Sequence, residues 1–178
     1  MRIFFDVDGV LIDGWHADSA LRKPWDATIE ADLGIDREAF QRLFFGLPAR
    51  RAASPMFACV TGRLELRSAL AEALPQLGYR GGVDSFIEYW FAKDSNLNGE
   101  VLALVDEIRA RTGAELYVAT GQEHLRARHL WHRLGFKHRF DGIFYSAELG
   151  QKMRGAGAEP SSSTADGMRT LLKNELAF

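Results

Sequence analysis

Helical and extended patterns alternate between residues 98 and 146, and this alternation restricts the chain to few folds. Residues 98–112 space their apolar side chains three and four apart, which predicts an amphipathic helix that Gly113 ends. Residues 114–119 have the pattern of a strand, and a second helix (127–134) and another strand (142–146) follow. Strands joined in this way by helices pair in parallel through right-handed crossovers. The sequence therefore predicts an α/β protein with a parallel sheet.

The amino-terminal residues 2–7, RIFFDV, are β-prone and apolar on both faces, which predicts a first, buried parallel strand. The stretch from Gly14 to Trp90 contains no convincing strand pattern, so it is predicted to be a helical insertion after this strand. Its expected helices cover residues 24–33, 36–46, 66–77 and 85–92.

Composition excludes several classes of protein. A length of 178 residues suits one domain, and a net charge of −2 gives no reason to expect nucleic acid or an anionic membrane as partner. The single cysteine, Cys59, excludes an internal disulfide and most thiolate metal sites. No apolar run approaches a transmembrane span, and Asp6 interrupts any signal-peptide core. We therefore expect a soluble, cytoplasmic protein that binds neither membrane nor nucleic acid.

The strongest candidate for chemistry is the segment DVDGVL at residues 6–11. Asp6 and Asp8 follow the first predicted strand, at the edge where open parallel sheets bind their ligands. Paired carboxylates there provide the hard oxygen ligands that Mg²⁺ prefers, and one of them can act as a nucleophile. The alternative is a solvated turn, because acids and glycine are common at the end of a strand.

Several segments together resemble the haloacid dehalogenase (HAD) superfamily. The segment at residues 6–11 resembles the first motif of that family, and YVATGQ at residues 117–122 resembles the second. The passage from Leu130 to Gly150, with FDGIFYSAELG at its end, is similar to the family's segment after the second motif. The resemblance covers residues 1–152. It implies a Rossmannoid parallel sheet with an α-helical cap inserted after the first strand.

The resemblance also implies roles for individual residues. Asp6 matches the nucleophile and Asp8 the general acid/base, and both match ligands of Mg²⁺. Thr120, followed by Gly121, matches the group that binds the transferring phosphoryl group. Lys152 matches the lysine that neutralises the phosphate, although it comes one residue early and no proline follows it. An ordinary exposed lysine is the alternative reading of that position.

Thr120 and the next two residues are also predicted, independently of the family, to open a helix. The free N–H groups of a helix amino terminus favour an anion. The simpler alternative is that Thr120 is only the N-cap of that helix.

The carboxyl-terminal part departs from the family pattern. The implied domains are a core (residues 1–13 and 93–152), a cap (14–92), and an atypical flexible tail with a short terminal helix (153–178). The family's fourth motif, a strand ending in paired acids, is not found, because the later acids Glu159, Asp166 and Glu175 are isolated. The core is therefore predicted to be incomplete, the Mg²⁺ site weak and the first strand an open edge. A homo-oligomer formed through that edge is one expectation.

The function implied is that of a hydrolase, specifically a Mg²⁺-dependent phosphatase that acts on a small phosphorylated metabolite through an aspartyl-phosphate on Asp6. One alternative is a catalytically inactive HAD-like binding protein, which the missing fourth motif supports. A second alternative is a 2-haloacid dehalogenase. Because a halide leaves without a proton, that chemistry does not need an acid at position 8, so Asp8 favours the phosphatase.

Overall fold

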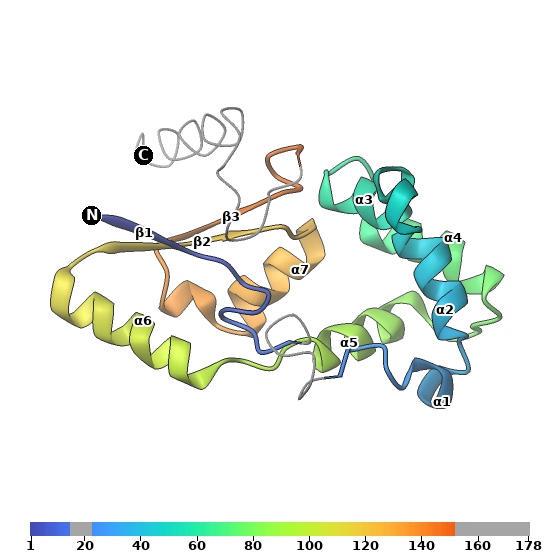
Figure 1. Cartoon of the computed structure of the whole chain (residues 1–178), viewed down its shortest axis with the longest axis horizontal. Helices are drawn as coiled ribbons and strands as arrows, with labels where there is room; N and C mark the ends of the chain where they lie inside the picture. Colours follow the sequence, from blue (N-terminus) through green and yellow to red (C-terminus); the bar gives the residue numbers. More distant parts are fainter. Residues whose placement is uncertain (15–22, 152–178) are drawn as a thin grey trace.

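Three strands form one parallel sheet in the order β1–β2–β3 (Figure 1). The structure is a computed structural model that describes residues 1–14 and 23–151. The strands are β1 (Arg2–Phe5), β2 (Glu115–Thr120) and β3 (Gly142–Tyr145). β2 lies in the centre, where Phe4 pairs with Tyr117 and Tyr117 pairs in turn with Gly142. The predicted parallel sheet is confirmed, and β1 is its edge strand among the described residues.

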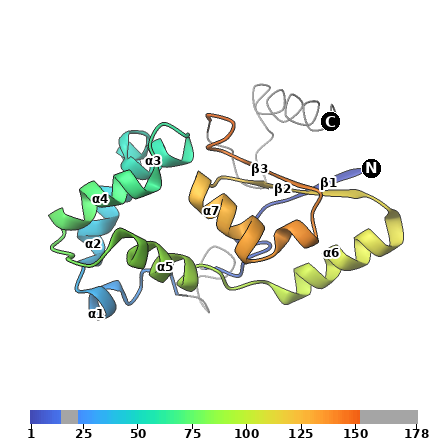
Figure 2. The same ribbon diagram turned by 180° about the vertical axis from the view of Figure 1, so that it is seen from behind.

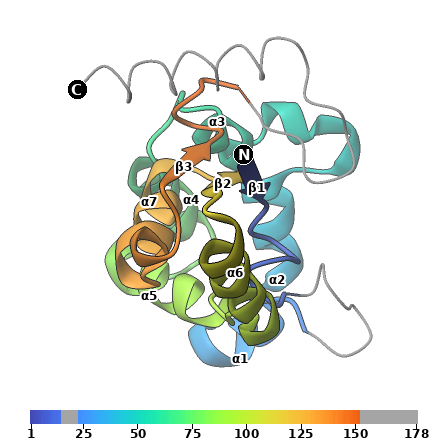
Figure 3. The same ribbon diagram turned by 90° about the vertical axis from the view of Figure 1, so that its left-hand side faces the viewer.

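Helices cover one face of this sheet (Figures 1 and 2). They are α6 (Gly99–Thr112), α7 (His124–Arg128), which continues into a π-helical turn (His129–Arg133), and a short 3₁₀ turn (Phe136–His138). Figure 3 looks along the strands and shows α6 and α7 on the same side of the sheet. The side chains between them form an apolar core that includes Val105, Val118, Leu130 and Phe140.

The described residues between β1 and α6 form no strand within the sheet, as the sequence predicted. The helices are α1 (Ile29–Leu33), α2 (Arg37–Phe40), a π-helical turn (Gln41–Phe45), a 3₁₀ segment (Pro48–Ala53), α3 (Pro55–Val60), α4 (Leu66–Gln76) and α5 (Val83–Lys93). We refer to α1–α5 and the turns between them as the cap helices. The first expected helix begins later than predicted, at Ile29, because residues 25–28 form turns.

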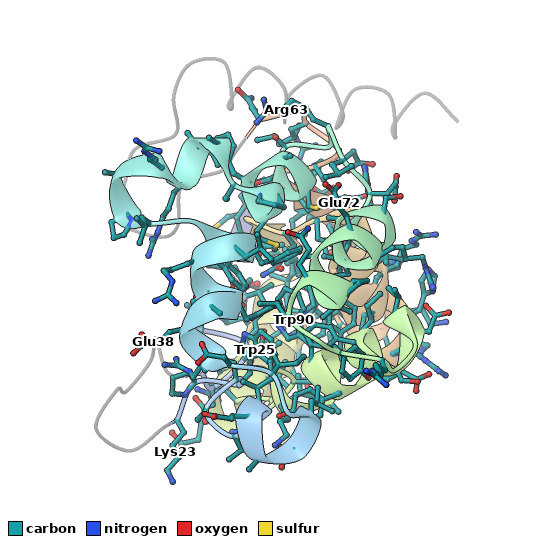
Figure 4. The ribbon with its side chains drawn as sticks, turned by 90° about the vertical axis from the view of Figure 1, so that its right-hand side faces the viewer. Lys23, Trp25, Glu38, Arg63, Glu72 and Trp90 are labelled. Carbon is teal, nitrogen blue, oxygen red and sulfur yellow. The ribbon has the colours of Figure 1, made fainter. Side chains whose placement is uncertain are left out.

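The cap helices have an apolar core of their own, which is rich in aromatic residues (Figure 4). Trp25 and Trp90 stack face to face at its centre with their rings 4.6 Å apart, and Phe40 and Phe44 stack at 5.4 Å. Stacked aromatic pairs add to the free energy gained from burying apolar area. Packing among the cap helices therefore positions the loops that face the sheet.

The predicted site residue Lys152 and the tail at 153–178, with its expected terminal helix, lie outside the described residues. In the ranges that the structure does describe, no helix is long and apolar enough to cross a membrane.

Candidate active site at the carboxyl edge of the sheet

The loop after β1 carries both predicted catalytic carboxylates. The Asp6 Oδ1 atom accepts a hydrogen bond of 2.8 Å from the backbone N–H of Val7. The Val7 carbonyl in turn accepts one of 2.9 Å from the Ile12 N–H, and Gly9 donates to the Ile12 carbonyl at 3.0 Å. Gly9 has a φ of 81°, a conformation that other residues rarely adopt. This tight turn holds Asp8 close to Asp6 at the end of the strand.

Thr120 ends the neighbouring strand. Since Phe5 pairs with Val118, Asp6 and Thr120 follow that pair on adjacent parallel strands, as the sequence predicted. Thr120 is buried, and its Oγ1 atom has no hydrogen-bond partner within the described residues. A buried hydroxyl without a partner loses the free energy of its hydration, so such atoms are rare in folded proteins. The position suits a group that binds a ligand.

Gln122 connects the ends of the three strands. Its side-chain Nε2 donates a hydrogen bond of 2.7 Å to Oδ2 of Asp8, in the loop after β1. Its backbone carbonyl accepts one of 3.2 Å from the N–H of Ala147, in the turn after β3. Gln122 itself follows β2 and is buried. Gln122 is the last residue of the segment that resembles the second motif, but the sequence did not predict a contact between Gln122 and Asp8.

The helix after β2 begins later than the sequence predicted. Thr120 was expected to open it, but α7 begins at His124 and its N-cap is Glu123. The Glu123 carboxylate accepts hydrogen bonds from the backbone N–H groups of Leu125 (2.7 Å) and Arg126. Burial raises the pKa of the Glu123 carboxyl, although these two donors lower it. Because Glu123 already satisfies these N–H groups, the reading of Thr120 as the N-cap is wrong.

A buried arginine joins α7 to the segment that follows the cap helices. The Arg126 guanidinium donates to the Ser95 hydroxyl at 2.9 Å and to the Asp94 carbonyl, and it lies 5.1 Å from the ring centre of Phe91. Burial lowers the pKa of Arg126, whereas the charges of Asp94 and then Asp8 raise it. The contacts of Arg126 with Ser95 and Asp94 connect α7 to the end of the cap segment. No apolar period marks a buried arginine, so sequence analysis missed it.

The cap helices contact the same edge of the sheet. Gly62, in the loop after α3, has a φ of 70° and lies so close to the Ala147 carbonyl that a Cβ atom there would overlap it. Figure 1 shows the end of α3 next to the loop that follows β3. Arg63 follows this contact and donates from Nε to the Thr61 hydroxyl at 2.9 Å. The loop at residues 61–63 therefore contacts the turn after β3, at the carboxyl edge of the sheet where the candidate site lies.

The structure thus brings four of the five predicted site residues to one edge of the sheet: Asp6 and Asp8 after β1, and Thr120 and Gly121 at the end of β2. The fifth, Lys152, lies outside the described residues. No group of three or more His, Cys, Asp or Glu side chains that suits a metal occurs within residues 1–14 and 23–151. Two carboxylates alone still fit Mg²⁺, which prefers hard oxygen ligands and often keeps several of its waters.

Comparison with known proteins finds a likeness in fold. No family model matches the chain, and no curated protein matches it. Among solved structures, a HAD family enzyme from Bacteroides thetaiotaomicron, solved as a magnesium complex, has a TM-score of 0.57 with 11% sequence identity. The match covers 98% of this chain and 77% of that enzyme. The protein therefore has a HAD-like fold, a Rossmannoid parallel sheet with helices inserted after its first strand.

Proposed function

We propose that the protein is a hydrolase of the HAD-like type, a Mg²⁺-dependent phosphatase that acts on a small phosphorylated metabolite. The observation that carries the proposal is the common position of a carboxylate pair and a buried hydroxyl without a partner. Asp6 and Asp8 follow β1, and Thr120 ends the adjacent parallel strand β2. A nucleophile, an acid/base and a phosphate-binding group are the parts that phosphoryl transfer through an enzyme intermediate requires.

In the first step, a carboxylate oxygen of Asp6 attacks the phosphorus atom and the bond to the ester oxygen breaks. The product is an aspartyl-phosphate, and Asp8 gives its proton to the departing alkoxide. In the second step, Asp8 takes a proton from water, and the water oxygen attacks the same phosphorus atom. The bond to Asp6 breaks, inorganic phosphate leaves, and both carboxyl groups return to their starting states.

Thr120 and Gly121 would bind the transferring phosphoryl group. The Thr120 hydroxyl, which lacks a partner within the described residues, would donate to a phosphoryl oxygen. Gly121 has no side chain, so its backbone N–H is open to a bulky anion. Lys152, one residue beyond the described range, is proposed to neutralise the combined charge of Asp6 and the phosphate.

Asp6 and Asp8 are also the residues that would hold Mg²⁺. The ion would reduce the repulsion between an anionic carboxylate and an anionic substrate. The HAD family enzyme from Bacteroides thetaiotaomicron is a magnesium complex, which supports the choice of ion. Because the Asp8 carboxyl group transfers the proton, the described residues would offer the ion the Asp6 carboxylate and the Asp8 backbone carbonyl, and we expect it to bind weakly.

The two other functions are less well supported. A 2-haloacid dehalogenase does not need a proton donor for its leaving halide, whereas here Asp8 is held by Gln122 next to Asp6. A binding protein without turnover agrees with the small number of metal ligands among the described residues. It does not explain why an acid, a nucleophile and a phosphate-binding hydroxyl occupy one edge.

The test is hydrolysis of p-nitrophenyl phosphate with and without millimolar Mg²⁺. We expect Mg²⁺-dependent release of phosphate, its loss in Asp6→Asn, and a mass increase of one phosphoryl group on the enzyme before turnover. The control is Asp106→Asn. Asp106 is exposed on α6, pairs with Arg139 at 3.2 Å and has no proposed part in the reaction. Full activity of Asp6→Asn would disprove the proposal, and no hydrolysis by any variant would favour the binding protein.

A further inference from the structure

Asp8 is held by a side chain that has no assigned part in the reaction. Its Oδ2 atom accepts a hydrogen bond of 2.7 Å from Nε2 of Gln122. Asp8 itself is exposed, whereas Gln122 is 8% exposed. An exposed carboxylate therefore accepts a hydrogen bond from a buried donor. Hydrogen bonds to charged groups are stronger than those between neutral groups, so this contact restricts the orientation of Asp8.

Gln122 is itself held in place by its backbone. Its carbonyl accepts the N–H of Ala147, and the neighbouring Thr120 carbonyl accepts the N–H of Ser146 at 3.1 Å. The Ala147 carbonyl lies directly against Gly62 of the cap loop. The position of Gln122 therefore depends on the turn after β3, which the loop at residues 61–63 contacts. Its side chain reaches the loop after β1.

We propose that Gln122 is a positioning residue that orients the Asp8 carboxyl group for proton transfer and links its position to the turn contacted by the cap. This inference rests on the proposed phosphatase function, since it assigns a task to Asp8. In this role Gln122 contributes through its contact with Asp8 and needs no contact with the substrate. Gln122 acts through Asp8, and the N–H group that it donates is what orients the Asp8 carboxyl group.

Two substitutions separate the hydrogen bond from packing. Gln122→Leu removes the donor, and Gln122→Glu keeps the shape of the side chain but replaces the amide N–H by a carboxylate oxygen and adds a negative charge. We expect both to lower kcat by about tenfold or more, as weakened acid/base catalysis does, with KM changed less than about twofold. The control is Gln76→Leu, since Gln76 is exposed on α4 and its amide donates to the Glu72 carbonyl of the same helix. Normal kcat in Gln122→Glu would overturn the proposal.

A combined variant tests whether Gln122 acts through Asp8. In an Asp8→Asn background the acid/base is already lost, so Gln122→Leu should lower kcat by less than about twofold more. Residues that act as one unit show such non-additive effects. A further tenfold loss would show that Gln122 acts independently of Asp8 and would contradict the inference.

A second readout does not depend on phosphatase activity. The urea midpoints of Gln122→Leu, Asp8→Ala and the double variant form a cycle without metal or substrate. Because both single changes remove the same hydrogen bond, the midpoint shift of the double variant should be smaller than the sum of the two single shifts. Additive shifts would overturn the Gln122–Asp8 link. If this cycle is coupled while the wild type hydrolyses no phosphate ester, only the proposed function fails.

Discussion

At the scale of single residues, the two carboxylates of the site differ in how they are held. Asp6 accepts a hydrogen bond from the backbone N–H of the next residue, Val7, which is fixed by the strand end. Asp8 accepts one from the side chain of Gln122, which follows the neighbouring strand β2. The donor to Asp6 is therefore local backbone, whereas the donor to Asp8 is a side chain from a separate element. If the proposed roles hold, the nucleophile is oriented by its own loop and the acid/base by a residue from across the sheet edge.

The first prediction separates these two roles. Asp6→Asn should abolish formation of a phosphoenzyme from p-nitrophenyl phosphate, because its amide is a very poor nucleophile. Asp8→Asn should still form the phosphoenzyme, since nitrophenolate leaves without an acid, but turnover should fall by about 10² to 10⁴-fold. Mass spectrometry of the quenched enzyme measures both. Equal and mild defects in the two variants would contradict the assignment of Asp6 as nucleophile.

The second prediction concerns His129, which begins the π-helical turn after α7, the helix of Arg126. Its Nε2 atom lies 3.2 Å from the Ser95 hydroxyl, and its ring packs on Phe91 at 5.0 Å. Burial, and then the charges of Arg126 and Arg133, lower the pKa of His129 from 6.5 to about 4. The unfolded chain therefore binds a proton at higher pH than the folded protein does, so the free energy of unfolding falls as the pH drops from 6.5 to 4.

Urea unfolding across this pH range measures the effect. His129→Gln should make the urea midpoint less dependent on pH between 6.5 and 4 than it is in the wild type. His132→Gln is the matched control, because His132 is exposed in the same π-helical turn. The same slope in the wild type and His129→Gln would show that His129 does not cause the acid sensitivity.

At the scale of elements, the sequence predicts best those helices that carry both a cap and an apolar period. For α6, the Asn98 side chain accepts the Val101 N–H at 3.1 Å and Gly113 ends the helix with a φ of 61°. The segment from Pro48 to Val60 was not predicted, because its proline, arginine and alanine residues have no clear period. This segment is helical because it packs within the cap. Ser54 also stabilises it, since its hydroxyl accepts the Phe57 N–H at the start of α3.

The candidate site divides in the same way between what the sequence predicts and what it does not. Asp6 and Thr120 could be predicted because each comes at the end of an apolar strand, and parallel strands end at one edge. Gln122 and Arg126 could not be, because a buried polar residue is recognised by its partners and these are distant in sequence. Asp8 is 114 residues from Gln122, and Ser95 is 31 residues from Arg126.

The third prediction concerns the start of α6. Asn98 caps this helix and also donates from Nδ2 to Oδ1 of Asp13 at 2.9 Å. Asn98→Ala removes both bonds and should lower the free energy of unfolding by about 1 to 2 kcal/mol. Asn96→Ala is the control, because Asn96 is exposed and its amide lies 3.4 Å from the Asp13 carbonyl. Urea titration measures the difference, and equal effects would show that the cap contributes little.

At the scale of the whole molecule, the two apolar cores are separate, one among the cap helices and one between the sheet and α6 and α7. The two connections between them run side by side. Ile12 and Leu97 form an antiparallel bridge, and the Asp13 N–H donates to the Asn96 carbonyl at 2.7 Å. Arg126 holds the second connection against α7. These polar contacts, together with the packing of Leu125 in α7 against the apolar core of the cap helices, therefore connect the cap helices to the layer of the sheet.

The last prediction concerns the edge of the sheet. Within the described residues, β1 has a neighbouring strand on one side only, and Phe4 in its middle is 40% exposed. An unpaired apolar edge strand offers its backbone N–H and C=O groups to another chain, so we expect a second copy of the protein to pair there as concentration rises. A charge on the edge strand opposes such pairing, and Phe4→Lys should therefore weaken self-association.

Sedimentation velocity over a concentration series measures this association. Leu47→Lys is the matched control, because Leu47 is also exposed but belongs to the cap helices, away from the sheet edge. It should associate as the wild type does, whereas Phe4→Lys should remain monomeric at higher concentration. If the wild type is monomeric throughout, or if both variants behave alike, β1 is not the surface through which the chains associate. Because Phe4 also stacks on Tyr117 at 5.4 Å, the urea midpoint of Phe4→Lys is measured as well. Association that is lost in a folded Phe4→Lys variant, and kept in Leu47→Lys, would identify β1 as the interface.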